Sequence, residues 1–466
     1  MDRSLARTLA VALLLCAAPG AHAAQLNVDS TVDSTDTNPG DGKCVSKAGG
    51  CTLRAAIEEA NATTLSDTIM VPAGTYVLNS PDEGPNYAQS GPLFLNGEVE
   101  VIGAGATSTI IDGGGKARVF ETQLNSVISL SGLTIRNGLA NGADGGGILS
   151  RGHLKLSDVT LDGNRSKTDP QNANGRGGAL FVAEGSDAKL LDVRITNNTA
   201  DGRGGGVYND GSLQIMNGTV RGNASLTDDG GGICNSGTLK LLITEVDGNR
   251  ATNGGGIDNV EGSVEITDST LAANTASSSG GAIFNSGTVT AVNSTISGNT
   301  AGGSGGGILN RAQGTVALNN VTIASNRAGS GGDAKGGGIA NDGTGAVTVA
   351  NSIIAANTAA NGADCAGVLT SQGYNLLQSD AGCSIAGDTA GNVIGKDAQL
   401  AVLADNDGPT RTQAPAATSP AIDGGNPGKP TGRDGTCAPA DQRGKSREAG
   451  RCDIGAYETT AAAAAR

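Results

Sequence analysis

The chain has 466 residues, of which 76 are glycine, while aromatic residues make up 2 % and tryptophan is absent. This composition argues against a core of large side chains, and a 37 % hydrophobic content without blocks of like charge argues against a disordered chain. The net charge of −14 disfavours nucleic acid as a partner.

Residues 1–23 predict a secretory signal peptide. Two arginines precede an apolar run from Leu9 to Ala18, and the small residues Ala21 and Ala23 stand before the expected cleavage point. The apolar run is much shorter than the ~20 residues of a membrane span. We therefore expect an exported protein, secreted or held at the cell surface, with no membrane span in its mature chain.

Residues 24–61 predict an N-terminal cap that contains a short amphipathic helix. Within "CTLRAAIEEAN" (51–61), Leu53, Ala56, Ile57 and Ala60 fall on one helical face, and Thr52 suits the N-cap position. A helix of this kind can cover the open end of a solenoid core.

Residues 62–360 predict a solenoid. After a few irregular coils, a phrase such as "GGGIC" recurs at intervals of roughly 25 residues. Its eight copies begin at residues 145, 177, 204, 230, 254, 280, 305 and 336. The run "SVEITDSTLAAN" (263–274) shows the alternation of a strand, and return segments such as "NTASSSGG" are too rich in glycine for helices. The expected fold is therefore all-β, a single-stranded right-handed parallel β-helix.

Equivalent residues of successive coils stack in such a fold, about 4.8 Å apart. The last asparagine of each repeat forms one unbroken column, Asn164, Asn198, Asn223, Asn249, Asn274, Asn299, Asn326 and Asn357. Because amides can bond to one another along a column and asparagine tolerates left-handed turns, we predict a structural asparagine ladder here. The glycines are expected to supply positive φ angles or close backbone approach at another corner.

One patch in the first repeated coils could carry chemistry. With the ladder in register, Lys155 stacks on Lys189 and Asp158 on Asp192, with Arg194 nearby. Calcium-assisted lyases and two-carboxylate hydrolases require acidic pairs beside basic residues, so these five residues are the candidate catalytic side chains. The alternative is architectural, because the aspartates begin a column of turn positions that also contains Asn217, Ile243, Asp268, Asn293, Asn320 and Asn351.

Other catalytic motifs are missing from the sequence. His153, the single histidine after the signal peptide, stacks on Asp187 and is expected to be an ordinary solvated side chain. No Gly-x-Ser-x-Gly elbow and no Cys/His cluster with zinc spacing occurs. We expect neither a cofactor nor a metal ion.

A further column follows the glycine phrase. It holds Phe181, Tyr208 and Phe284 together with Leu149, Leu309 and Cys234. We expect this column to form an inner stack, with an exposed apolar stripe for a ligand as the alternative.

The other cysteines lie outside the repeats, as three pairs close in sequence. We predict the disulfides Cys44–Cys51, Cys365–Cys383 and Cys437–Cys452, which suit an oxidising compartment, and a free buried thiol at Cys234.

Residues 361–466 predict an irregular C-terminal region rich in glycine, aspartate and proline. Its motifs "SPAIDGG" (419–425), "DQRG" (441–444) and "DIGAYE" (453–458) are similar to the choice-of-anchor Q domain. "CVSKAGGCTLRAAIEEAN" (44–61) resembles the CSLREA motif of exported bacterial β-helix proteins. The repeats resemble the right-handed pectate-lyase-like β-helix and the "GGAI" repeats of autotransporter adhesins. These resemblances imply location and fold more firmly than a reaction.

Together these observations predict an exported, surface-associated β-helix scaffold or adhesin-like binding protein without catalytic activity. A polysaccharide lyase or glycoside hydrolase of the pectate-lyase-like type is the alternative. The expected partner is an extracellular polysaccharide or another cell-surface ligand.

Overall fold

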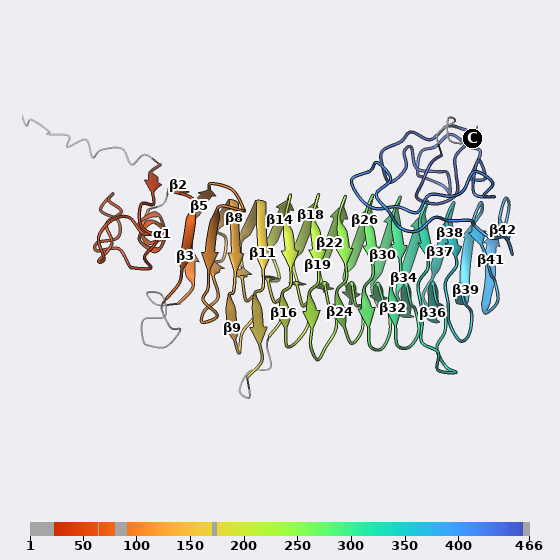
Figure 1. Ribbon diagram of the computed structural model, residues 1–466, viewed down its shortest axis with the longest axis horizontal. Helices are drawn as coiled ribbons and strands as arrows, with labels where there is room; N and C mark the ends of the chain where they lie inside the picture. The colour runs from red at the N-terminus through yellow and green to blue at the C-terminus, as the bar shows by residue number, and fades with distance from the viewer. Residues whose placement is uncertain (1–22, 64, 80–90, 170–174, 460–466) are drawn as a thin grey trace, which may run out of the picture.

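The protein is an elongated solenoid with a cap at its N-terminal end and a C-terminal region that lies along the side of its last coils (Figure 1). The structure, a computed structural model, describes residues 23–63, 65–79, 91–169 and 175–459. All but the last residue of the expected signal peptide lies outside these ranges. Every pairing between named strands is parallel, and equivalent residues of successive coils pair in register. The predicted right-handed parallel β-helix is therefore confirmed.

The opening coils lead from the cap into the repeats. Their elements are β1 (Gln25–Asn27), α1 (Leu53–Asn61), β2 (Ser66–Val71), β3 (Gly74–Val77), β4 (Leu93–Leu95), β5 (Glu98–Gly103), β6 (Thr109–Asp112), β7 (Phe120–Thr122), β8 (Val127–Arg136) and β9 (Leu139–Asn141). Since β1 already pairs with β2, the solenoid begins within the segment expected to be only a cap.

Helix α1 has the predicted N-cap and the predicted buried face. The Thr52 hydroxyl accepts a hydrogen bond from the backbone N–H of Ala55 at 3.1 Å, and it donates one to the carbonyl of Ser34 at 2.6 Å. The apolar face of the helix packs against the end of the main core. Among the described residues, no helix is long and apolar enough to cross a membrane.

A typical repeat has four short strands. In one coil these are β22 (Thr238–Leu242), β23 (Glu245–Asp247), β24 (Arg250–Ala251) and β25 (Ile257–Asn259), with the glycine phrase between the last two. We name the four positions the first, second, third and fourth strand of a coil. Third strands form a sheet of their own, whereas the others belong to one large sheet.

The remaining strands of the repeats follow this order. First strands are β11 (His153–Asp162, which also spans the second position), β14 (Asp187–Leu191), β18 (Ser212–Met216), β26 (Ser263–Thr267), β30 (Thr288–Val292), β34 (Thr315–Asn319) and β37 (Val347–Ala350). Second strands are β15 (Arg194–Thr196), β19 (Thr219–Arg221), β27 (Thr270–Ala272), β31 (Thr295–Ser297), β35 (Thr322–Ala324) and β38 (Ile353–Ala355). Third strands are β12 (Arg165–Lys167), β16 (Thr199–Ala200), β20 (Ala224–Ser225), β28 (Thr275–Ala276) and β32 (Thr300–Ala301). Fourth strands are β10 (Ile148–Ser150), β13 (Leu180–Val182), β17 (Val207–Asn209), β21 (Ile233–Asn235), β29 (Ile283–Asn285), β33 (Ile308–Ala312) and β36 (Ile339–Gly343).

The solenoid continues past residue 360, where the repeated phrase ends. Its last strands are β39 (Cys365–Gln372), β40 (Leu376–Leu377), β41 (Cys383–Asp388) and β42 (Val393–Ile394). Backbone pairing needs only extended segments, so β39 pairs with β36 and β37 although its sequence has lost the repeat. The Cys365–Cys383 disulfide joins β39 to β41 across these last coils.

The asparagine ladder forms as predicted and is buried. The backbone N–H and the Nδ2 of Asn249 both donate to Asn274 Oδ1, at 3.0 Å each, and Nδ2 also donates to the carbonyl of Val220 at 2.9 Å. The same pattern links all eight members, and Asp364 Oδ1 accepts the last pair of bonds from Asn357. The ladder therefore supplies every coil of the repeats with buried coil-to-coil hydrogen bonds.

A second asparagine ladder, which sequence analysis missed, runs along the ends of the fourth strands. Its members are Asn209, Asn235, Asn259, Asn285, Asn310 and Asn341, each with Nδ2 donating to the next Oδ1 at 2.7–3.0 Å. The ladder starts at Asn209 because its neighbour in the preceding coil is Val182. The sequence does contain the signal, since an asparagine stands two places after the aliphatic residue in consecutive repeats.

Left-handed backbone positions fall beside the ladder rather than on it. The ladder asparagines have no positive φ, which corrects that part of the expectation, whereas residues just before them, such as Gly248 at 64°, do. The first glycine of the phrase is also left-handed, with φ of 73° at Gly230. The third glycine meets the expectation of close approach, because a Cβ at Gly256 would lie 2.7 Å from the carbonyl oxygen of Ala282.

The aromatic column does not form the inner stack that we expected. Phe181 and Tyr208 belong to a small cluster with Leu149 and Cys234, separate from the main core, and Phe284 belongs to another. Strand alternation explains the difference, since each of these residues follows an aliphatic residue that points inward. The cluster is buried nonetheless, and the guanidinium of Arg176 lies over the rings of Phe181 and Tyr208, 4.9 and 4.7 Å from their centroids.

This outer cluster also contains a buried carboxyl group. Asp258 is 2 % exposed, and its Oδ2 accepts a hydrogen bond from the free thiol of Cys234 at 3.5 Å. Burial, with a smaller contribution from Asp229 and against the nearby Arg203, raises the pKa of Asp258 to about 7. Burial also raises the pKa of the Cys234 thiol well above its usual value, so both groups are neutral in mildly acidic solution.

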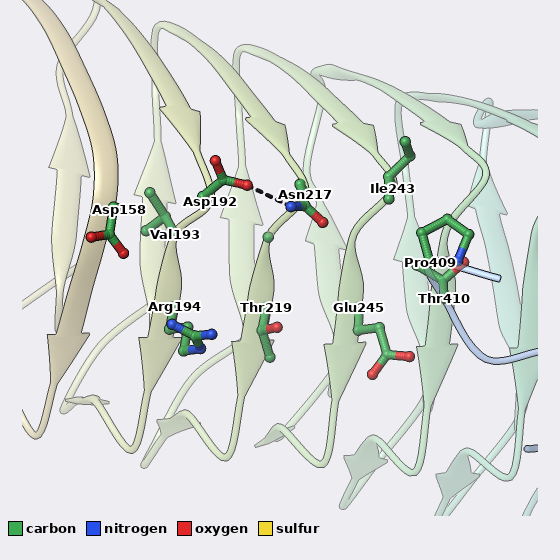
Figure 2. Close-up of a pocket in the computed structure, with 11 residues that line it drawn as sticks. Asp158, Asp192, Val193, Arg194, Asn217, Thr219, Ile243, Glu245, Pro409 and Thr410 are labelled. Carbon is green, nitrogen blue, oxygen red and sulfur yellow. Dashed lines mark hydrogen bonds between the residues drawn. The ribbon is translucent and has the colours of Figure 1, made fainter. Parts of the chain in front are cut away.

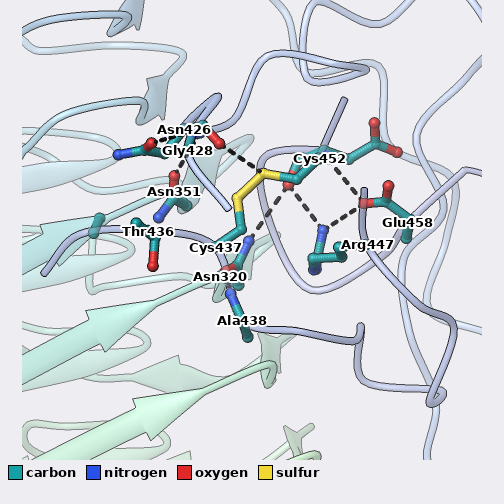
Figure 3. The surroundings of a disulfide bond; sticks show 12 residues. Asn320, Asn351, Asn426, Gly428, Thr436, Cys437, Ala438, Arg447, Cys452 and Glu458 are labelled. Atoms are coloured by element: carbon teal, nitrogen blue, oxygen red, sulfur yellow. Dashed lines mark hydrogen bonds and ion pairs between the residues drawn. A yellow bond between two sulfur atoms is a disulfide. The ribbon is translucent and has the colours of Figure 1, made fainter. Parts of the chain in front are cut away.

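The C-terminal region, residues 395–459, packs along the corner between the first and second strands of the later coils. Asn320 Oδ1 accepts from the backbone N–H of Ala438 at 2.8 Å, and Asn351 Nδ2 donates to the carbonyl of Gly435 at 2.9 Å, beside the Cys437–Cys452 disulfide (Figure 3). The third expected disulfide, Cys44–Cys51, lies in the N-terminal cap. The solenoid and the C-terminal region therefore form one packed unit.

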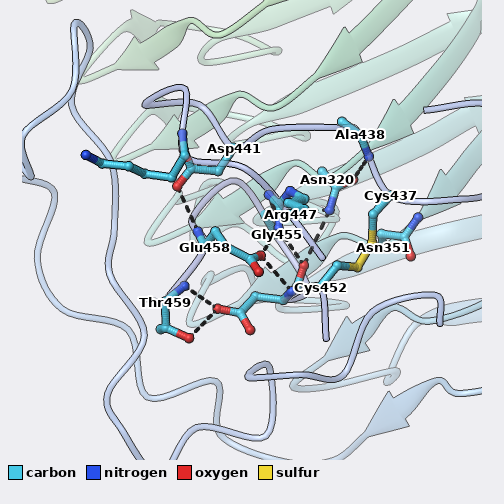
Figure 4. Close-up of polar contacts among 12 residues, drawn as sticks. Asn320, Asn351, Cys437, Ala438, Asp441, Arg447, Cys452, Gly455, Glu458 and Thr459 are labelled. Carbon is cyan, nitrogen blue, oxygen red and sulfur yellow. Dashed lines mark hydrogen bonds and ion pairs between the residues drawn. A yellow bond between two sulfur atoms is a disulfide. The ribbon is translucent and has the colours of Figure 1, made fainter. Parts of the chain in front are cut away.

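Buried polar contacts organise this region internally. Arg447 Nη1 donates to Glu458 Oε2 at 2.7 Å and Nη2 to the carbonyl of Gly455 at 2.7 Å (Figure 4). Asp441 Oδ2 accepts from the backbone N–H of Glu458 at 2.9 Å. Burial raises the pKa of Glu458 to about 7 despite its arginine partner. The motifs "DQRG" and "DIGAYE" thus meet in one structural network.

Removing one rung of the asparagine ladder should weaken the solenoid. Asn249→Ala leaves buried N–H and C=O groups of neighbouring coils without partners, and we expect the free energy of unfolding to fall by about 1–3 kcal/mol. Denaturant unfolding followed by circular dichroism measures this. Asn96→Ala, at an exposed side chain, is the matched control and should change it little; equal effects would contradict a special role of the ladder.

Asp258 should make stability depend on pH. Its carboxyl ionises near pH 4 in the unfolded chain but near pH 7 in the folded protein, so its stabilising effect is complete below pH 4 and is lost as the pH rises to about 7. We expect Asp258→Asn to remove a decline of up to about 1.4 kcal/mol per pH unit across that window. Denaturant titrations at several pH values measure the slope. Asp342→Asn, at an exposed side chain, should leave it unchanged.

Candidate functional site

An open groove runs across the first repeated coils, with a volume of about 380 Å³. We call it the turn groove, because it follows the corner between first and second strands (Figure 2). Its lining residues are Asp158, Asp192, Val193, Arg194, Asn217, Gly218, Thr219, Ile243, Glu245, Pro409 and Thr410.

Two columns of side chains form the floor of the turn groove. The turn column consists of Asp158, Asp192, Asn217 and Ile243, all left-handed with φ between 51° and 55°. The strand column consists of the first residues of successive second strands, in which Arg194 pairs with Thr219 and Thr219 with Glu245. Asparagine and aspartate tolerate the left-handed turn, which explains why polar side chains recur at this corner.

The C-terminal region closes the groove at one end. Pro409 and Thr410 line this end, and the Thr410 hydroxyl donates to the carbonyl of Asp268 at 2.9 Å. The next residue, Arg411, contacts Glu245 Oε1 at 3.1 Å and Asp247 Oδ1 at 3.0 Å. Although burial opposes the charge of Arg411, its hydrogen bonds to these carboxylates raise the guanidinium pKa above its usual value. We call residues 409–411, which close this end, the groove wall; the ion pairs of Arg411 hold it against the solenoid.

The structure brings together three of the five candidate residues. Asp158, Asp192 and Arg194 line the turn groove. Lys155 and Lys189 pair in register as expected, but they are exposed on the first strands and do not line it. The five side chains therefore do not converge on one point. His153 lies beside them on the same strand, and its Nδ1 is hydrogen-bonded to Asp187.

Part of the site was not predicted from the sequence. Asn217 and Ile243 were recognised only as structural turn positions, although the column itself predicts that they follow Asp192. Thr219 and Glu245 occupy the strand column and could have been found by extending the register from Arg194. Pro409 and Thr410 carry no sequence signal, because no repeat connects them with coils more than 160 residues away.

The turn groove offers both hydrogen-bond donors and acceptors. Asn217 Nδ2 donates to Asp192 Oδ1, while the Asp158 carboxylate makes no hydrogen bond to any described residue. Beyond the wall, Asp268 continues the turn column, and burial by the C-terminal region raises its pKa to about 6. Within the described ranges, no three or more His, Cys, Asp or Glu side chains are grouped so that they could hold a metal ion. The groove can bind polar groups of either charge.

Comparisons with known proteins give limited similarity. Residues 192–210, about one coil, match the Chlamydia polymorphic membrane protein repeat. No curated protein matches the chain. Among solved structures, the crystal structure of pectate lyase Pel9A is similar with a TM-score of 0.45 and 13 % identity, covering 95 % of this chain and 98 % of that one. A complex of the alginate lyase AlyF-OU02 with G6 has a TM-score of 0.36 and 13 % identity, covering 84 % and 92 %.

Loss of the Arg411 side chain should loosen the groove wall. In Arg411→Ala both ion pairs are lost, and we expect backbone amides of residues 405–412 to exchange with deuterium about three- to ten-fold faster. Hydrogen exchange followed by mass spectrometry measures this. Arg433→Ala removes an exposed arginine from the same region and is the matched control; unchanged exchange in Arg411→Ala would contradict the assigned role.

Proposed function

We propose that this is an exported, surface-associated β-helix scaffold that binds a cell-surface ligand in the turn groove without cleaving it. The observation that carries the proposal is that the polar columns of the solenoid have structural roles. Two asparagine ladders and a left-handed turn column run from coil to coil, and the groove is where the turn column remains open to solvent.

The arrangement of the candidate residues supports binding rather than catalysis. Acid–base chemistry requires its groups within hydrogen-bond reach of one reacting atom. The two lysines stand on the first strands outside the groove, and Asp192 is already hydrogen-bonded to Asn217. The three disulfide bonds agree with an oxidising compartment. The predicted signal peptide and the resemblance to the CSLREA and choice-of-anchor Q motifs support export and surface location as proposals.

A lyase or glycoside hydrolase is the second candidate function. The observation that favours it is that Asp158, Asp192 and Arg194, three of the five candidate catalytic residues, line one groove. Two carboxylates beside an arginine are compatible with bond cleavage in a bound sugar.

One experiment separates the two functions. The mature protein is incubated with polygalacturonate, alginate and xylan, with and without calcium, and unsaturated products and reducing ends are measured. We expect neither product, while binding to fixed bacterial cells is saturable and about three- to ten-fold weaker in Asp192→Ala.

Asp342→Ala, at an exposed carboxylate on β36, is the control and should bind cells normally. Turnover that Lys189→Ala or Asp192→Ala abolishes would establish the enzymatic alternative. If Asp192→Ala bound cells as strongly as the wild type, the binding face would lie outside the turn groove.

A further inference from the structure

The turn groove is the open half of a surface whose other half already binds polypeptide. The strand column continues from Glu245 to Thr270, Thr295 and Thr322, and the turn column continues from Ile243 to Asp268 and beyond. The C-terminal region lies on these later positions. The same two columns are therefore occupied in the later coils and exposed in the earlier ones.

In the occupied half, the columns contact the backbone of a chain without regular secondary structure. The Thr270 hydroxyl donates to the carbonyl of Arg411 at 2.6 Å, and the Thr322 hydroxyl accepts from the backbone N–H of Ala456 at 3.0 Å. The turn column contributes in the same way, since Asn351 Oδ1 accepts from the backbone N–H of Asn426 at 2.9 Å. Hydroxyl and amide groups at fixed spacing thus bind N–H and C=O groups.

The open half repeats this chemistry. Thr160 and Thr219 belong to the strand column of Thr270 and Thr322, and their hydroxyls make no hydrogen bond to any described residue. Asn217 belongs to the turn column of Asn351, and its Oδ1 makes no hydrogen bond within the described part of the chain. Equivalent donors and acceptors are therefore available in the turn groove at Asn217 and Thr219, and beside it at Thr160.

Charge indicates which side chain the ligand presents. Where the occupied half begins, Glu245 and Asp247 receive the guanidinium of Arg411. In the open half, the carboxylates of Asp158 and Asp192 stand one coil apart and line the groove. Arg194 also lines the groove, but among the described residues no ion pair joins it to either aspartate, so both carboxylates can pair with an arginine or lysine of the ligand.

We infer that the turn groove binds an extended polypeptide segment that carries a basic side chain. The inference rests on the proposed function, because it names the class of ligand for that same groove. A polysaccharide is the less suitable ligand here, since sugars are commonly held by stacking on aromatic rings and no aromatic side chain is among the groove's described lining residues.

A labelled peptide tests this inference directly. The probe is a fluorescent peptide with the sequence of residues 408–413, GPTRTQ, whose one charged side chain is the equivalent of Arg411, and fluorescence anisotropy follows its binding to the intact mature protein. We expect saturable binding that weakens about three- to ten-fold in the double variant Asp158→Ala/Asp192→Ala and that falls as salt rises. The same peptide with Arg411→Ala should bind more weakly by a similar factor.

Controls separate the possible failures. Asp342→Ala should bind the peptide like the wild type, and circular dichroism confirms that each variant keeps its β-helix. Peptide binding that is equal in the double variant would mean that the probe displaces the native C-terminal segment instead, which overturns the inference. If the peptide does not bind while an oligosaccharide binds in a manner dependent on Asp192, the inference fails and the proposed function stands. Polysaccharide cleavage in the previous experiment would instead remove the proposed function.

Discussion

Backbone pairing between successive coils is the constraint on which the rest of this structure depends. It places each residue directly over its equivalent in the coil before, about 4.8 Å away, so every position of the repeat becomes a column of like residues. Aliphatic side chains satisfy the constraint inside, and small residues satisfy it where backbones approach closely. Asparagine satisfies it at buried corners, because its amide is both a donor and an acceptor and can bond to an identical neighbour.

The columns also explain how the C-terminal region attaches to the solenoid. The turn column and the strand column repeat in every coil at the outer corner, as the asparagine ladders do in the interior. They present hydroxyls, amides and carbonyls at regular spacing. A chain that folds back along this corner finds partners at each coil it crosses, as Gln442 does when its Oε1 accepts from Thr295 and its Nε2 donates to Thr270. Lateral packing of this kind leaves the remaining coils with an exposed corner, and that corner is the turn groove.

Local patterns in the sequence were enough to predict much of the fold. Alternation and period predicted the parallel strands, and Thr52 with the apolar face behind it predicted α1. The second ladder was equally visible but was overlooked. The predicted inner position of Phe181 was wrong, because strand alternation points this residue away from the main core. The groove wall lay beyond prediction, since the contact of Arg411 with Glu245 joins residues 166 apart that share no pattern.

Asp158 and Asp192, the two exposed aspartates of the turn column, illustrate how a column with a structural role can also form a binding surface. In the turn column, Asp158 and Asp192 are the one place where acids follow each other in successive coils, whereas elsewhere an acid is followed by a neutral residue. Backbone pairing holds the two residues in neighbouring coils, so their like charges disfavour each other. Glu245 and Asp247, which also lie close together, resolve the same conflict by sharing Arg411, and Asp247 pairs with Arg221 as well. A cationic group from outside would relieve the repulsion between Asp158 and Asp192 in the same way, and the stacking that fixes the fold would thereby favour a basic ligand.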